Sequence, residues 1–200
     1  MIPAEALLGG FADPVFESQS VFRGVLTALS RPGRVVDLVA SVTPPSPLMS
    51  GAAAILVTLA DDTTRLWLDA ALSHGAVPAW AGFHTGAPIV SDPAAAAIAV
   101  VADPLEIPPF HAFQLGTAEY PDRSTTLIQQ VQSLDDGGPG LVLAGPGIDG
   151  HAHLAPGPLP ADFIARMRAN RALFPRGVDL FLVAGSQVVG LPRSTRVSEA

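Results

Sequence analysis

The chain has 200 residues, of which 48% are hydrophobic and only 14% are charged, and its formal net charge is −7. A chain of this length and composition predicts a single domain, spanning residues 1–200, with a substantial core, and the acidic balance argues against a nucleic-acid-binding surface or a polybasic membrane patch. The low charge also predicts that some apolar surface is covered by another subunit.

Two residue types that carry much catalytic chemistry are missing. All eleven basic residues are arginine, so the chain has no lysine, and it has no cysteine either. Without lysine there is no Schiff base to pyridoxal phosphate (PLP) and no phosphate-binding P-loop; without cysteine this chain holds no iron–sulfur cluster. We therefore expect no cofactor, and we expect any anion site to use arginine, hydroxyl groups or backbone amides.

The N-terminal segment and the uncharged span 70–91 both argue against export or membrane insertion. The first residues include Glu5 and no early base, unlike the basic start of a signal peptide. The uncharged span 70–91 is interrupted by prolines, glycines and histidines, which makes it a poor membrane helix. We expect a cytoplasmic protein.

The first helix has clear start and stop signals. Apolar residues recur at helical spacing after Asp13, which is a good N-cap, and Pro14 suits the first helical position. The helix should end at Arg31, because Pro32 and the glycine after it cannot continue it.

Strands and helices then alternate with short connections. A short strand is expected at 35–39, and the alanine- and leucine-rich run 51–60 favours a helix. A strand follows at 65–68, and then a helix at 73–83 with Ser73 as its cap.

The middle of the chain predicts buried strands and one hairpin. The run 94–101 is expected to be a strand, and 107–115 a short helix. Segments 125–134 and 141–144 have strand character on either side of a glycine-rich loop, which predicts a β-hairpin.

The last elements complete an α/β pattern. A helix is expected at 160–171, and strands at 178–184 and 187–191 surround the turn at Gly185-Ser186. Alternation of this kind predicts a mixed sheet with helices on both faces and antiparallel hairpins late in the chain.

Asp149, His151 and His153 form the most conspicuous candidate metal site. In a strand, residues two apart face the same side, so the two histidines could share a zinc ion. This arrangement would suit a stand-alone metal-dependent hydrolase. The favoured alternative is an edge strand with exposed histidines, because the other three histidines lie in unrelated contexts.

Gly145-Pro146-Gly147 precedes these histidines and suggests a phosphate loop. However, Pro146 lacks an N–H donor, and the residues that follow favour a strand over the helix N-terminus that phosphate loops use. A turn between two late strands is the favoured interpretation.

Arginines beside hydroxyl groups are the better candidates for an anion site. Arg123 and Ser124 are adjacent, Arg193 precedes two hydroxyl residues, and Arg176 lies in a loop. His84 and Thr85 are further polar candidates. They could line the wall of a pocket, or they could belong to a helix-capping turn at Gly86. No catalytic constellation is evident, although Asp122 and Asp179 are possible bases.

Several stretches, in this order, resemble the PhnH family of the bacterial carbon–phosphorus (C–P) lyase core complex. They are FRGVLTALSRPG (22–33), ILVTLADDTTRLWL (55–68), FHTGAPIV (83–90), FQLGTAEYPDRSTTLIQQVQSL (113–134), and FPRGVDLFLVAG with LPRSTRV (174–197). The resemblance implies a cytoplasmic homodimer with a three-layer α/β/α sandwich, similar to the large domain of PLP-dependent transferases but without PLP.

The resemblance also implies partners and a reaction. Family members assemble with PhnG, PhnI and PhnJ. With PhnG, PhnI and PhnL they support the formation of alpha-D-ribose 1-phosphonate 5-triphosphate from ATP and an alkylphosphonate. The nucleosidase chemistry belongs to PhnI and the C–P bond cleavage to PhnJ, and no catalytic residue carries over to this chain. The sequence therefore predicts an accessory subunit that is not catalytic alone.

Overall fold

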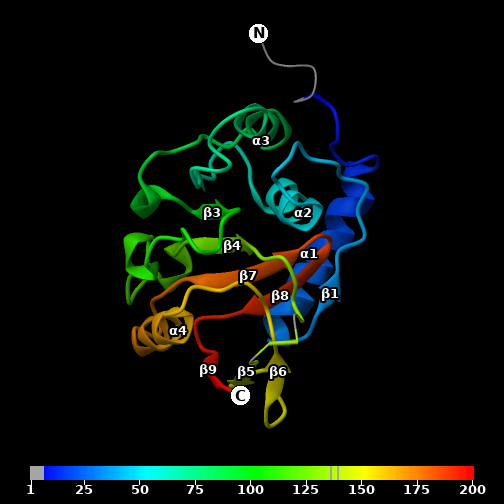
Figure 1. Ribbon diagram of the computed structural model, residues 1–200. Coiled ribbons are helices and arrows are strands. Elements are labelled where there is room, and N and C mark those ends of the chain that lie inside the picture. The colour runs from blue at the N-terminus through cyan, green and yellow to red at the C-terminus, as the bar shows by residue number, and fades with distance from the viewer. Residues whose placement is uncertain (1–6, 136, 139) are drawn as a thin grey trace.

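A six-stranded mixed sheet forms the centre of the molecule in the computed structural model, which describes residues 7–135, 137–138 and 140–200 (Figure 1). Its strands, in spatial order, are β1 (Val36–Asp37), β8 (Gln187–Leu191), β7 (Asp179–Ala184), β4 (Thr126–Gln130), β3 (Ile98–Val101) and β2 (Leu66–Leu68). The four strands from β7 to β2 are parallel, whereas β8 and β1 run antiparallel to their neighbours.

Helices cover both faces of this sheet. Helices α1 (Pro14–Ser30), α2 (Ser50–Leu59) and α3 (Val77–Thr85) pack on one face, and α4 (Phe163–Ala172) lies on the other (Figure 1). Alternate residues of β7 contribute to the two cores: Phe181 faces the first three helices, and Leu182 faces α4. The predicted α/β class with a mixed sheet and helices on both faces is confirmed.

The layer that contains α4 also includes a second, smaller sheet. Its strands are β6 (Ala152–Leu154), β5 (Leu141–Ala144) and β9 (Arg196–Glu199), paired antiparallel in that order. The predicted hairpin between 125–134 and 141–144 is wrong, because β4 pairs in the large sheet while β5 pairs with β6 and β9. Both predicted segments have strand character, and their pattern does not say which sheet each joins.

The first and last predicted elements match the structure well. Helix α1 begins after Asp13, whose carboxylate accepts from the Phe16 N–H at 3.2 Å, and it ends at Arg31. Helix α2 and the antiparallel pair β7–β8 also lie where they are expected. No helix among the described residues is both long and apolar enough to cross a membrane.

Other elements are shorter than expected or shifted. Helix α3 begins at Val77, with Pro78 in its first turn, instead of at a Ser73 cap; the Ser73 hydroxyl donates to the Ala70 carbonyl. The segment 107–115 contains only a 3₁₀ turn, Phe110–Ala112, and the expected strand at 94–101 begins with another, Pro93–Ala95. Prolines account for these differences, since they favour the first turn of a helix and interrupt longer runs.

Candidate functional site

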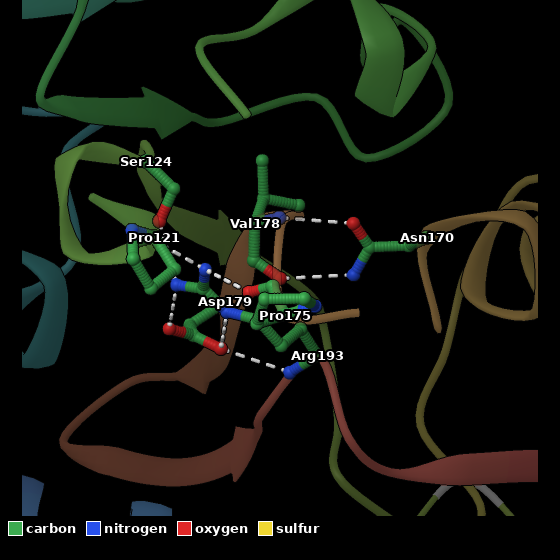
Figure 2. Close-up of polar contacts among 7 residues, drawn as sticks. All are labelled: Pro121, Ser124, Asn170, Pro175, Val178, Asp179 and Arg193. Atoms are coloured by element: carbon green, nitrogen blue, oxygen red, sulfur yellow. Dashed lines mark hydrogen bonds and ion pairs between the residues drawn. The ribbon is translucent and has the colours of Figure 1, made fainter. Parts of the chain in front are cut away.

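Arg193 and Asp179 form the most densely bonded polar junction of the molecule (Figure 2). Asp179 is the first residue of β7, and Arg193 lies in the loop between β8 and β9. Arg193 Nη2 is 2.6 Å and Nε 3.1 Å from the two oxygens of the Asp179 carboxylate, and the Arg193 backbone N–H donates to the same carboxylate at 2.8 Å. This is a bidentate ion pair, the strongest form of such a contact.

The rest of the Arg193 guanidinium binds two further loops. Nη1 donates to the carbonyls of Pro121 at 2.8 Å and Pro175 at 3.1 Å, and Nη2 also donates to the Ser124 hydroxyl at 2.6 Å. A guanidinium has five N–H donors, and these contacts occupy all of them. Arg193 therefore joins the loop before β4 and the loop before β7 to its own.

The same region is fixed to helix α4 by a buried amide. Asn170 Oδ1 accepts from the Val178 N–H and its Nδ2 donates to the Val178 carbonyl, both at 2.9 Å (Figure 2). Gly177 precedes this contact with a φ of +122°, and a Cβ at that residue would lie 2.7 Å from Asn170 Oδ1. The start of β7 is thus held rigidly from both sides.

The structure brings together two of the predicted anion-binding residues, Ser124 and Arg193. Their shared network leaves no donor free, since the Asp179 carboxylate neutralises the Arg193 guanidinium and each of its N–H groups has an acceptor. An anion could bind Arg193 only if these acceptors gave up some of its donors. Anion binding at this pair stays a prediction.

The other two arginine candidates adjoin that network in the sequence, but their side chains point to other surroundings. The Arg123 guanidinium stacks 4.1 Å from the centroid of the Tyr120 ring, a cation–π contact on the surface. Arg176 is exposed in the loop between α4 and β7. Their role in anion binding also stays a prediction.

His84 and Thr85 lie at the C-terminal end of α3, where they form a capping turn. The Thr85 hydroxyl donates to the Ala81 carbonyl at 2.6 Å and accepts from the Ala87 N–H at 3.0 Å, and Gly86 has a φ of +73°. The His84 ring packs against Trp80 with centroids 4.7 Å apart. The local geometry matches the capping turn. A part for these two residues in anion binding stays a prediction.

His151 and His153 lie at the open edge of the small sheet. His153 is in β6, His151 directly precedes it, and both side chains are exposed. Within the described ranges, no three His, Asp or Glu side chains lie close enough to hold a metal ion. The edge-strand interpretation is confirmed, and the described geometry gives the metal-dependent hydrolase no support.

The glycine-rich stretch before these histidines is the turn between β5 and β6. Gly145 and Gly147 both have positive φ values, 139° and 83°, and the two strands that they connect are antiparallel neighbours. The hairpin interpretation of Gly145-Pro146-Gly147 is confirmed, since a strand follows the turn where a phosphate loop needs a helix.

Sequence reasoning missed one buried acid. Asp69 follows β2, is only 4% exposed, and accepts hydrogen bonds from the backbone N–H groups of Leu72, Ala102 and Asp103 at 2.8–3.0 Å. These bonds tie the carboxyl ends of β2 and β3 together, which makes Asp69 a structural anchor. An acid directly after a short apolar strand was the available signal.

The arrangement of Figure 2 is thus a structural junction without an evident reacting group, and the family relationship carries the functional information. The family model for the bacterial phosphonate metabolism protein PhnH matches residues 9–198. The chain is 45% identical over 189 residues to the alpha-D-ribose 1-methylphosphonate 5-triphosphate synthase subunit PhnH of Rhizobium meliloti (strain 1021), covering 94% of each protein.

A second relative has a related name. The HtxG protein of Stutzerimonas stutzeri, provisionally named a C–P lyase subunit protein, is 33% identical over 200 residues, covering 98% of this chain and 92% of HtxG. A family match across nearly the whole chain and two full-length relatives agree with the motifs found in the sequence. The chain belongs to the PhnH family of bacterial phosphonate metabolism proteins.

Proposed function

We propose that this chain is a subunit of a C–P lyase complex in phosphonate catabolism. With PhnG, PhnI and PhnL, it supports the formation of alpha-D-ribose 1-phosphonate 5-triphosphate from ATP and an alkylphosphonate. The observation that carries the proposal is the 45% identity, over 94% of both chains, to a protein named as a subunit of that synthase. The 33% identity to HtxG supports the same complex.

Within the complex, the chain acts as an accessory subunit and leaves catalysis to its partners. The bidentate Arg193–Asp179 pair and the Asn170–Val178 contact support this role, because both use their polar groups to fix loops. An absent lysine also rules out Schiff-base chemistry by this chain itself.

The partners are PhnG, PhnI, PhnJ and PhnL proteins, and the isolated chain forms a homodimer. Exposed apolar side chains on α1 support burial against another protein: Val15 is 75% exposed, Phe16 71%, Leu26 50% and Phe22 46%. Val15, Phe22 and Leu26 share one face of the helix, since their spacing of seven and four residues matches helical turns.

The fold and location follow from the same family. The parallel strands flanked by helices on both faces are consistent with an origin in the large domain of PLP-dependent transferases, here without the lysine that would bind PLP. A complex that makes a ribose triphosphate would work in the cytoplasm, where nucleoside triphosphates are produced.

Reconstitution by omission tests the function. A mixture of the PhnG, PhnI and PhnL partners with this chain should convert ATP and methylphosphonate to the ribose triphosphate, and leaving this chain out should abolish the product. The chain alone should give no turnover. Full activity without the chain, or robust turnover by the chain alone, contradicts the accessory role.

A further inference from the structure

Three arginines that the sequence did not single out meet at one pocket. Arg168 and Arg171 belong to α4, and Arg196 begins β9, which packs beside that helix. All three line a pocket of about 390 Å³, together with His151 from the edge of the small sheet. We name this the arginine pocket.

The local geometry explains why these side chains converge. Arg168 and Arg171 are three residues apart and so are neighbours on the surface of α4, beside the buried Met167. Arg196 is opposite Ala144 in the antiparallel pair β9–β5, which places both side chains on the same face of the small sheet. The helix forms one wall of the pocket and the sheet forms the other.

The charge of the arginine pocket is unbalanced. No acidic side chain lines it, and within the described ranges none of its three guanidiniums forms an ion pair. The nearby Arg166 does have an acidic partner, Asp162, at 2.8 Å. Three unpaired guanidiniums together are unexpected in a chain of net charge −7, because their mutual repulsion favours an anion between them.

A buried hydroxyl at the pocket provides an independent observation. Thr195 lines the arginine pocket and is only 1% exposed, and its Oγ1 atom has no hydrogen-bond partner within the described residues. Buried polar groups almost always have a partner, and one that lacks it destabilises the fold. An oxyanion bound beside Thr195 would supply the missing acceptor.

A second hollow shares Arg171 with the arginine pocket. This hollow, about 240 Å³, is lined by Arg171, Ser194, Pro146 and Phe174, whose ring is 65% exposed. Together the two hollows form a lining with three guanidiniums and one exposed aromatic ring. A single phosphate or carboxylate would use only part of it.

We infer that the arginine pocket binds the polyphosphate chain of a small phosphorylated molecule. Guanidinium forks match phosphate oxygens, and 390 Å³ is within the usual range for small-molecule sites of about 300–1,000 Å³. The choice of a triphosphate rests on the proposed function, in which a ribose 5-triphosphate is made. Thr195 and Ser198 supply hydroxyls, and the exposed Phe174 ring lies where a base or sugar would follow the phosphates.

Isothermal titration calorimetry on the full-length chain tests the inference. The probes are ATP, inorganic triphosphate and methylphosphonate, each at physiological ionic strength. ATP and triphosphate should both bind, and methylphosphonate should bind at least about tenfold more weakly, because it engages fewer guanidiniums. Binding of ATP but not of triphosphate would show that the base dominates and would overturn the polyphosphate assignment.

Variants locate the binding. The double variant Arg168→Gln/Arg171→Gln should weaken triphosphate binding by about tenfold or more, since charge-assisted bonds to phosphate are lost. Thr195→Val, which keeps the side-chain shape, should also weaken it. Arg23→Gln, at an exposed arginine of α1 that lies across the large sheet from the pocket, is the matched control and should leave the affinity unchanged. No binding, or equal losses in the control, overturns the inference.

Co-purification distinguishes a failure of this inference from a failure of the proposed function. The double variant should still assemble with its partner subunits and keep its melting temperature. A chain that assembles but binds no triphosphate refutes the pocket and leaves the proposed function standing. If the double variant instead loses assembly while the wild type binds no triphosphate, the pocket is a contact for an acidic partner surface. Triphosphate binding by a chain that never assembles refutes the proposed function alone.

Discussion

Arg193 shows how one side chain determines the arrangement of three loops. Its contacts reach residues 14 to 72 positions away in the sequence, and they include both oxygens of Asp179. The sequence indicated Arg193 and Ser124 as polar candidates because each lies beside other polar residues. It could not identify the acceptors, since bonds over such separations depend on how the strands are ordered.

Arg193→Lys should destabilise the protein by about 1–3 kcal/mol. A lysine has three donors in place of five and cannot form the bidentate pair with Asp179, so some partners lose their bonds. The measurement is urea-induced unfolding of both proteins. The control is Arg176→Lys, the same change at an exposed residue, which should stay within about 0.5 kcal/mol of the wild type. Equal stability of the two variants contradicts the role of Arg193 in holding the three loops together.

Gly177→Ala should destabilise the protein more strongly than an ordinary glycine substitution. A Cβ at Gly177 meets Asn170 Oδ1 at 2.7 Å as well as requiring a positive φ, whereas Gly75 has a φ of +71° and open space around it. Gly75→Ala therefore measures the strain of a left-handed φ without a steric contact, about 1–2 kcal/mol. Gly177→Ala should exceed it by about 1 kcal/mol or more, because its φ of +122° suits alanine less well and its Cβ meets Asn170. Thermal unfolding of the two variants compares them directly. A similar loss in both would contradict the tight fit of Gly177, since its backbone and Asn170 would then adjust without further cost.

At the scale of elements, the first helix is tied to a distant loop by one carboxylate. The Glu17 side chain in α1 accepts from the backbone N–H groups of Ser41, at 2.7 Å, and Asp13, at 2.9 Å. The Ser41 backbone bond is the largest cause that lowers the pKa of Glu17 below its ordinary value of 4.5, and the Asp13 bond adds to it. The ionised form of Glu17 thus stabilises the fold.

The pH dependence of stability should reflect this lowered pKa. Because the folded state favours the ionised form, the contribution of Glu17 is present above pH 4.5 and is lost as the pH falls through the lower pKa of the folded state. Glu17→Gln should therefore be less stable than the wild type at neutral pH, with the difference shrinking in acid. Urea unfolding across that range measures it, with Glu119→Gln as an exposed control. A constant difference at all pH values contradicts the assignment.

The predictability of each element followed the strength of its local signals. Helix α1 was predictable because Asp13, Pro14 and Pro32 mark its ends, and the β7–β8 pair because Gly185 forms its turn. Strand β9 and the pairing of β5 were not, since a segment with strand character can pair in either sheet and only tertiary packing decides. The arginine pocket was missed for the same reason: the side of α4 that carries Arg168 and Arg171 was readable, but its proximity to β9 was not.

At the scale of the whole molecule, α1 carries an exposed apolar face. Three large side chains on one side of this helix, Val15, Phe22 and Leu26, are between 46% and 75% exposed. Apolar surface of this kind favours association, which agrees with the low charge of the chain.

The double variant Phe22→Glu/Leu26→Glu should convert the proposed homodimer to a monomer, because two charges would be buried in the interface. Light scattering after size exclusion measures the mass, and circular dichroism checks that the helices remain. Val39→Glu, a charge placed at a side chain that is 76% exposed and outside α1, is the control and should leave the dimer intact. A dimer that persists in the double variant locates the interface away from this face.

Co-expression with the PhnG, PhnI and PhnJ proteins of the same organism tests the central claim most directly. An affinity tag on this chain alone should recover all four proteins in one complex with fixed stoichiometry by native mass spectrometry. Recovery of the tagged chain alone, while the other three proteins assemble without it, would contradict its assignment as a subunit.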